Sequence, residues 1–566
     1  MRIVVSAFAV VIAAVGVHAY NSTLDIQSNL AATNHSAMAD PGKPLAHLTP
    51  NVGWMNDPNG LFFDNETSMW HAYYQYNPND NIWGLPLYWG HASSEDLVTW
   101  NDHGIALEPE NDESGAFSGS IVIDFNNTSG LFDNTCLPGQ RIVALYTEHS
   151  EAGERQYAAY SLDGGYTFNY YKHNPVLDIN STQFRDPKVF WHEETERWVM
   201  TLALSQEYKI QIYTSKNLTS WEFQSNFSHH GVLGYQYECP GLSKIPIVHT
   251  TSSNLTQSAG LTTNNGFADY KWVMFLSINP GAPHGGSYNE YFIGDFDGKR
   301  FTAQDAATRA VDCGKDFYAM QTFSNAPNGE VLAMAWASNW DYSGYVPTRD
   351  WRSSMTVVRN LTLRYYSPNP ETSELTLYNQ PVFKSSGLNT KQRLIKKSLK
   401  LNSNESAIFN VADGAHGLLE FTLEWKVNSS AVTTGHDMAD LSLKIKGVED
   451  DSEYLRLGYV VSAAAFFLDR GNSRVNFVHA NPFFGNKVSK NLEPYESAED
   501  GLPIYNVQGL IDRNLIELFF NDGSSSSTNL FFLSSENYLG EFEVSTGVDN
   551  VFTILNFDVQ QLSVGN

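Results

Sequence analysis

The sequence predicts an all-β protein built from two regions. Helical periodicity is scarce along its 566 residues, and most segments are short alternating or apolar runs bounded by Gly, Asn, Asp and Pro. Charged residues make up 17% and aromatic residues 13%, a composition typical of a folded, aromatic-rich chain. The length allows more than one domain, each with a large core.

The N-terminus predicts secretion. Arg2 precedes an apolar run over residues 3–17, and Val17-His18-Ala19 offers a cleavage site. We expect a signal peptide over residues 1–19 and an N-terminal extension over 20–42. The run is too short for a membrane anchor, and no later segment is long and apolar enough to span a bilayer. The net charge of −27 argues against nucleic acid or an anionic membrane as a partner, because both would repel the chain.

A loose internal repeat occupies residues 43–370. Five segments combine a polar turn with an apolar strand start: Asn56-Asp57-Pro58, Phe117-Ser118-Gly119-Ser120, Arg185-Asp186-Pro187, Tyr237-Glu238-Cys239-Pro240 and Tyr318-Ala319-Met320-Gln321. Four are followed by a hairpin signal that ends in an aromatic residue, as in Ser94-x-Asp96-Leu97-x-x-Trp100 and Ser215-x-Asn217-Leu218-x-x-Trp221. Each unit could hold one four-stranded sheet, and five such sheets would make a propeller. A generic β-sandwich with recurring hairpins explains the same pattern.

The region from 391 to 566 predicts a β-sandwich. Residues 419–427 alternate apolar and polar side chains, as expected of a half-buried strand, and 441–446 repeat the pattern. We expect Asp469-Arg470-Gly471-Asn472 to form a hairpin turn. Residues 371–390 are the predicted linker between the two regions, and residues 248–266 an exposed loop inserted into the fourth unit.

Three of the repeated segments carry an acid just before proline: Asp57-Pro58, Asp186-Pro187, and Glu238 one residue ahead of Cys239-Pro240. Equivalent positions on the inner strands of a propeller converge, so the three carboxyls could share one pocket. Glycoside cleavage with retention needs two such groups, one as nucleophile and one as acid/base. Each acid also has a structural interpretation: a turn at Asn56-Asp57-Pro58-Asn59-Gly60, a surface ion pair between Arg185 and Asp186, and a buried structural acid at Glu238. The recurrence of an acid at one point of the repeat favours the functional interpretation.

At these residues the sequence resembles glycoside hydrolase family 32, the invertases, inulinases and fructosyltransferases. The motifs are Trp54-Met55-Asn56-Asp57-Pro58-Asn59-Gly60, Phe184-Arg185-Asp186-Pro187 and Tyr237-Glu238-Cys239-Pro240, with support from Tyr74-Gln75-Tyr76-Asn77-Pro78 and Trp336-Ala337-Ser338-Asn339-Trp340. The resemblance implies a five-bladed β-propeller followed by a C-terminal β-sandwich.

The resemblance also implies a function and a site. It assigns Asp57 as nucleophile, Glu238 as acid/base and Asp186 as transition-state stabiliser of a β-fructofuranosidase acting on sucrose and fructo-oligosaccharides, without metal or cofactor. The fructose pocket would be lined by Asn56, Asn59, Gln75, Trp83, Phe117, Ser118, Arg185 and Trp340. By the same resemblance we expect a homodimer or larger homo-oligomer. A dedicated fructosyltransferase, an exo-inulinase and a non-catalytic sugar-binding wall protein are the alternatives.

Modification sites and thiols complete the sequence evidence. Twelve Asn-x-Ser/Thr sequences predict N-glycosylation behind the signal peptide: Asn21, Asn34, Asn65, Asn126, Asn127, Asn180, Asn217, Asn226, Asn254, Asn360, Asn404 and Asn428. The three cysteines, Cys136, Cys239 and Cys313, are too few for a disulfide framework and lack zinc-ligand spacing, so we predict no metal site. Whether Cys136 and Cys313 pair stays open.

Overall fold

The computed structural model describes residues 40–249, 269–369, 371–383, 388–403, 405–411, 416–432 and 439–564. The signal peptide, Asn21, Asn34, Asn254, Asn404 and nearly all of the 248–266 loop lie outside the described residues. Within the described part no helix has the length and hydrophobicity to cross a bilayer. The α-helix of the described chain is the short α1 (Asn476–Ala480), so the all-β prediction is confirmed.

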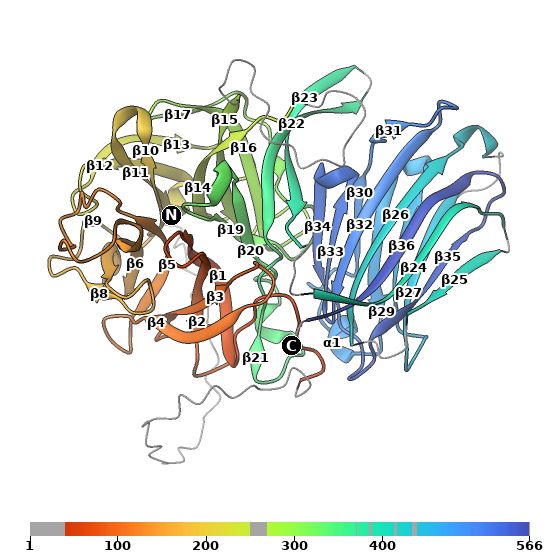
Figure 1. Cartoon of the computed structure of the whole chain (residues 1–566), viewed down its shortest axis with the longest axis horizontal. Coiled ribbons are helices and arrows are strands. Elements are labelled where there is room, and N and C mark those ends of the chain that lie inside the picture. Colours follow the sequence, from red (N-terminus) through yellow and green to blue (C-terminus); the bar gives the residue numbers. More distant parts are fainter. Residues whose placement is uncertain are drawn as a thin grey trace, which may run out of the picture. The chain divides into compact units, whose positions relative to one another are not determined.

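Five sheets follow one another in the described residues up to Pro381, and their strands pair antiparallel except for β21, which pairs with β1 in parallel (Figure 1). The first two contain β1 (Gly53–Asp64), β2 (Met69–Asn77), β3 (Tyr88–Ser94), β4 (Asn101–Leu107) and β21 (Trp351–Arg352), then β5 (Gly115–Ile123), β6 (Ile142–Ser150), β7 (Gly153–Ser161), β8 (Asn169–Tyr170) and β9 (Leu177–Ser181). The third contains β10 (Phe184–His192), β11 (Arg197–Leu204), β12 (Lys209–Ser215) and β13 (Glu222–Ser228).

The fourth and fifth sheets complete this region. They contain β14 (Tyr237–Pro246), β15 (Tyr270–Ile278), β16 (Tyr288–Phe296), β17 (Phe301–Ala303) and β18 (Arg309–Ala310), then β19 (Tyr318–Thr322), β20 (Leu332–Trp336), β22 (Arg359–Asn369) and β23 (Thr372–Pro381). The first strands of the five sheets contact one another in a closed circle, β1 to β5, β5 to β10, β10 to β14, β14 to β19 and β19 to β1. We call these five the inner strands. A closed ring of sheets is the arrangement of a propeller.

The repeated hairpin signals occupy one place in the sheets. The Ser94 and Ser215 signals each begin at the end of the third strand and lead to the fourth. The hydroxyl of Ser94 accepts a hydrogen bond from the amide of Leu97 at 2.7 Å, and Ser215 accepts one from Leu218 at 2.9 Å. Leu97 and Leu218 both have positive φ, at 66° and 64°. The sequence repeat therefore reflects one turn built several times.

The second region is a sandwich of two sheets. One contains β24 (Leu388–Lys400), β26 (Leu418–Val427), β31 (Glu496–Ser497), β32 (Pro503–Asp512), β33 (Leu515–Phe520), β34 (Ser525–Leu530) and β36 (Phe552–Val564). The other contains β25 (Ser406–Asn410), β27 (Asp440–Gly447), β28 (Tyr454–Val460), β29 (Ala465–Asn472), β30 (Lys487–Asn491) and β35 (Leu539–Thr546). The predicted alternation is present in β26, whose apolar residues point into a core shared by both sheets.

Two local predictions are wrong. The predicted linker at 371–390 contains β23, which pairs with β22 from Arg359↔Pro381 to Asn369↔Thr372 and so belongs to the fifth sheet. The predicted turn at Asp469–Asn472 is the end of β29. Arg470 is fully buried there and donates hydrogen bonds to Asp316 at 2.5 Å and to the Tyr342 hydroxyl at 3.1 Å. Asp, Gly and Asn are frequent in turns, but here the segment continues the strand because Arg470 finds buried partners.

Buried ion pairs join the sandwich to the propeller. Arg359 of β22 donates to Asp312 at 2.9 Å and to Glu517 of β33 at 2.6 Å. His47 contacts Asp512 at 2.8 Å and Glu517 at 3.0 Å, and these carboxylates raise the pKa of His47 to about 9 against the opposing effect of its burial. Such groups are costly to bury unless they are paired, so the two domains are fixed to each other through these contacts.

Candidate active site

Each inner strand carries a β-bulge at the same point. In each inner strand the register of pairing with the second strand of the sheet shifts near the amino end. The shifts lie between Met55 and Pro58 in β1, Ala116 and Gly119 in β5, Arg185 and Lys188 in β10, Glu238 and Gly241 in β14, and Tyr318 and Gln321 in β19. A bulge bends its strand and re-aims the side chains beside it, and bulges often occur next to active sites. The five segments that stand out in the sequence are therefore the five bulges, and they form a ring at the amino ends of the inner strands.

The three acids occupy three different positions of the bulge. At each bulge, two residues of the inner strand lie opposite one residue of the second strand. Asp186 is the first residue of such a pair, Asp57 is the second residue of its pair, and Glu238 directly precedes its pair. Cys239 is the residue equivalent to Asp186, and Arg185 is the residue equivalent to Glu238. The expectation that the acids recur at one point of the repeat is wrong in this detail. Each carboxyl enters the site at its own angle because its place in the bulge differs.

Backbone conformation sets the direction of Asp186. Its φ is 65°, and the equivalent residues Cys239 and Ala319 have φ of 46° and 53°. A following proline, Pro187, favours an extended conformation at Asp186. Asp186 adopts the left-handed conformation, which is unusual for residues other than glycine. Backbone strain of this kind is concentrated at functional sites.

Asp57 is 8% exposed and held on both oxygens. Nδ2 of Asn56 donates to Oδ1 at 3.1 Å, and the Ser118 hydroxyl donates to Oδ2 at 2.8 Å. Burial raises the pKa of Asp57, these hydrogen bonds oppose the rise, and the charge of Glu238 adds to it. The hydrogen bonds favour the ionised form that a nucleophile needs.

Cys239 brings Asp57 and Asp186 together. Its thiol sulfur lies 3.4 Å from Oδ2 of Asp57 and 3.6 Å from Oδ2 of Asp186, and its backbone amide donates to the same Asp186 oxygen at 2.9 Å. Burial and the charges of Glu238 and Asp57 raise the pKa of Asp186 to about 7, although Arg185 lowers it. Cys136, Cys239 and Cys313 are all free thiols.

Glu238 is held by a cation and a phenol. Nη2 of Arg185 donates to Oε1 of Glu238 at 3.0 Å, and the Tyr318 hydroxyl donates to Oε2 at 2.5 Å. Burial would lower the pKa of Arg185, but the carboxylates of Glu238 and Glu154 raise it, so the guanidinium stays charged. Burial and the charge of Glu238 raise the pKa of Tyr318 well above its usual value, so its hydroxyl stays a donor.

Of the residues predicted to line the fructose pocket, Asn56, Ser118 and Arg185 hydrogen-bond to the acids. Asn56, Asn59, Gln75, Ser118 and Arg185 are buried, and Nε2 of Gln75 donates to the carbonyl of Ala116 at 2.9 Å. Trp83 is 41% exposed and meets the Phe117 ring edge-on, with centroids 6.2 Å apart. Trp340 packs on Trp54, whose indole donates to Asn56 at 2.7 Å. Buried amides and exposed aromatic faces are suited to hold a sugar ring.

Sequence reasoning missed three residues of the site. Tyr318 lies in one of the five segments, but a tyrosine there gave no sign of its contact with Glu238. Glu154 accepts a hydrogen bond from Arg185 at 3.2 Å and one from the amide of Phe184 at 2.6 Å. No motif marks Glu154, because its pairing with Arg185 depends on two neighbouring sheets. Cys239 stands in the Tyr237-Glu238-Cys239-Pro240 motif, but nothing in the sequence indicates that it contacts both Asp57 and Asp186.

Comparison with known proteins gives the family. Residues 47–381 match the glycosyl hydrolases family 32 N-terminal domain, and residues 384–560 match the family's C-terminal domain. Invertase 2 of Saccharomyces cerevisiae is 50% identical over 524 residues, covering 92% of this chain and 95% of its own. An extracellular exo-inulinase of Meyerozyma guilliermondii is 46% identical over 526 residues, covering 93% and 96%. The solved structure of a fructofuranosidase from Schwanniomyces occidentalis complexed with fructose is 45% identical, covers 93% of this chain and 99% of its own, and superposes with a TM-score of 0.86.

Proposed function

Because the chain belongs to glycosyl hydrolase family 32 and is an enzyme of the invertase (β-fructofuranosidase) type, we propose that it releases terminal non-reducing β-D-fructofuranosyl residues from sucrose, raffinose and short fructans with retention of configuration. The observation that carries the proposal is the meeting of Asp57, Asp186 and Glu238 from three inner strands. The contacts of Cys239 and Arg185 bind the three carboxyls into one buried cluster.

The first step forms a covalent intermediate. An oxygen of Asp57 attacks the anomeric carbon of the fructosyl group while Glu238 gives its proton to the departing glycosidic oxygen, so an ester forms as the glycosidic bond breaks. Tyr318 and Arg185 hold the two oxygens of Glu238 during this transfer. Asp186 accepts hydrogen bonds from fructosyl hydroxyls and stabilises the positive charge that develops on the ring.

The second step releases fructose. Glu238 takes a proton from water, and the water oxygen attacks the same carbon and displaces Asp57. A second sugar that replaces this water would accept the fructosyl group, so we expect some transfructosylation at high sucrose concentration. The glucose-to-fructose release ratio measures that share.

An exo-inulinase is the second candidate, since one relative of 46% identity carries that name. The two activities share the chemistry and differ in how they hold a long chain. Initial rates on sucrose, raffinose and inulin at equal concentrations of fructosyl ends separate them. A rate on inulin above that on sucrose would favour the second candidate.

Secretion, glycosylation and assembly are part of the proposal. The apolar run behind Arg2 supports export, and the relative above is named as extracellular. Among the predicted glycosylation sites, Asn65, Asn126, Asn180 and Asn226 are exposed. The side chain of Asn127 instead donates to the carbonyl of Phe132 at 2.7 Å, so Asn126 is the more accessible of that overlapping pair. Mass spectrometry of glycopeptides and light scattering of the secreted protein test these points.

Asp57→Asn tests the reaction itself. We expect the variant to fold and to lose essentially all hydrolysis of sucrose, since an amide is a poor nucleophile. Asp295→Asn is the matched control, because Asp295 is 78% exposed and pairs with Lys271 on the surface. Rapid quenching of the wild type with sucrose should add one fructosyl mass to the peptide that contains Asp57. Normal turnover by Asp57→Asn would refute the assignment.

A further inference from the structure

A second cavity lies at the other end of the propeller ring. Its volume is about 720 Å³, and its inner wall is formed by the carboxyl ends of β5, β10, β14 and β19. On β10, Arg185 and Asp186 belong to the acid cluster, whereas residues 188–192 line the cavity. A strand advances about 3.3 Å per residue, so the Lys188 backbone lies roughly 7 Å beyond that of Asp186. The residues that line the cavity include none of the three acids and none of the residues predicted to line the fructose pocket. It is therefore distinct from the candidate active site.

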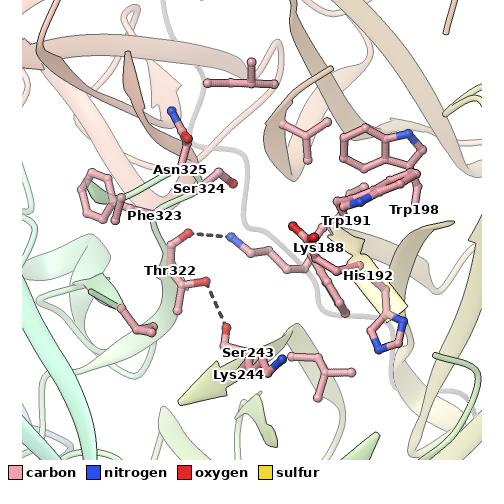
Figure 2. A pocket seen from close by; sticks show the side chains of 18 of the residues that line it. Lys188, Trp191, His192, Trp198, Ser243, Lys244, Thr322, Phe323, Ser324 and Asn325 are labelled. Carbon is pink, nitrogen blue, oxygen red and sulfur yellow. Dashed lines mark hydrogen bonds between the residues drawn. The ribbon is translucent and has the colours of Figure 1, made fainter. Parts of the chain in front are cut away.

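Lys188 is a buried cationic group of this cavity. It is 4% exposed, and its Nζ donates to the carbonyl of Thr322 at 2.6 Å, across the ring from β10 to β19 (Figure 2). Burial lowers the pKa of Lys188 to about 7, and no carboxylate of the described residues opposes this effect. An ammonium group has three N–H donors, so the contact with Thr322 leaves donors for a ligand.

Aromatic rings form one wall. Trp191 is half-buried, and its ring meets that of Trp198 at 68° with centroids 5.1 Å apart. The indole N–H of Trp198 already donates to the Thr128 hydroxyl at 2.8 Å, so a ligand would meet ring carbon and not this donor. Figure 2 shows both indoles on one side of the Lys188 chain and Thr322 on the other, with Ser243 bonded to Thr322 through hydroxyls 3.3 Å apart.

The charges at the cavity disfavour an anionic ligand. Lys244 pairs with Glu194 at 2.9 Å, and His192 lies 3.3 Å from the same glutamate. The lining carboxyls outnumber the two lysines, Lys188 and Lys244; they are Asp124, Glu193, Glu194 and Glu330. Aromatic faces with hydroxyl and amine groups between them suit a polyol, whose ring carbons stack while its hydroxyls hydrogen-bond. The volume is in the usual range for small-molecule sites, about 300–1,000 Å³.

We propose that this cavity is a second carbohydrate-binding site, which takes a neutral monosaccharide or disaccharide with its ring against Trp191 and its hydroxyls on Lys188, Thr322 and Ser243. The site holds sugar without cleaving it, because none of the three acids lines the cavity. The inference rests on the cavity and not on the reaction proposed for Asp57.

Fluorine NMR of the full-length protein labelled with 5-fluorotryptophan tests the proposal, with D-fructose as the probe. Trp191→Phe and Trp83→Phe assign the two signals. We expect both signals to shift during the titration and to saturate independently. Lys188→Met should weaken binding at Trp191 at least tenfold while leaving binding at Trp83 and sucrose hydrolysis within twofold of wild type. Asn56→Ala is the converse control and should weaken binding at Trp83 alone.

Three outcomes would overturn the proposal: a Trp191 signal that stays still while Trp83 saturates, equal affinity at Trp191 in Lys188→Met, or a response to inorganic phosphate without one to fructose. If Lys188→Met fails to fold, Ser243→Ala removes a hydroxyl from the same site and should weaken binding at Trp191. Loss of sucrose hydrolysis in Asp57→Asn concerns the reaction alone and leaves this test unaffected.

Discussion

The hydroxyl of Tyr318 lies 2.5 Å from Oε2 of Glu238, while Arg185 holds the other oxygen of the same carboxyl. Tyr318 and Glu238 come from neighbouring inner strands, β19 and β14, at the same point of their bulges. The orientation of the proposed proton donor thus depends on the packing of two sheets against each other.

Tyr318→Phe removes that hydrogen bond and little else. A hydrogen bond to a charged group contributes about 1.5–3 kcal/mol, so we expect kcat for sucrose to fall roughly 10- to 100-fold with KM nearly unchanged. Tyr342→Phe is the matched control, because its buried hydroxyl donates to Asp316 and accepts from Arg470 rather than from any residue of the acid cluster. That variant should lose stability and keep kcat. Equal kcat in Tyr318→Phe and wild type would show that Glu238 needs no such support.

Glu238→Gln keeps the shape of the side chain but cannot supply a proton. We expect kcat/KM for sucrose to fall by about 10²–10⁴-fold, the usual contribution of general acid catalysis. A fructoside with an aryl leaving group needs less protonation, so its loss in the first step should be smaller. Steady-state rates on sucrose and the aryl fructoside provide the comparison. A uniform loss on both substrates would argue against Glu238 as the proton donor.

Asp186→Asn should stabilise the fold at neutral pH and abolish turnover. The pKa of Asp186 is about 7 in the folded protein, above the usual value of 3.8, so the folded state binds a proton more tightly than the unfolded state. The corresponding stability is present below pH 4 and is lost as the pH rises to about 7. The variant should therefore exceed the wild type in Tm by about 1–3 °C at pH 7.5 and by less at pH 4. A Tm difference that does not depend on pH would contradict this reasoning.

Arg359→Met removes the cation between Asp312 and Glu517 at the domain contact. Two buried carboxylates would lose their partner, and we expect a loss of about 3–5 kcal/mol in the free energy of unfolding. Arg393→Met is the control, since the Arg393–Asp558 pair is largely exposed on the arginine side and such pairs contribute about 0–1 kcal/mol. Urea denaturation followed by tryptophan fluorescence measures both. Similar losses in the two variants would mean that the domain contact does not depend on its ion pairs.

Local patterns were enough for much of the fold. The alternation in β26 and the Ser94 and Ser215 hairpin signals are encoded by neighbouring residues, and both appear in the structure as expected. The predictions of a turn at Arg470 and of a linker at β23 are wrong for the same reason. A buried arginine resembles a turn residue, and an edge strand resembles a linker, until the partner that satisfies its polar groups is known.

For the acids, the sequence by itself determined which residues meet, through the five segments and the family motifs that contain Asp57, Asp186 and Glu238. Only the tertiary structure decided how they meet. Cys239 between two carboxyls, Tyr318 on Glu238 and Glu154 behind Arg185 each join residues on different strands or sheets. Such contacts depend on bulge geometry and on the packing of neighbouring sheets. Neither can be predicted from the spacing of residues along one strand.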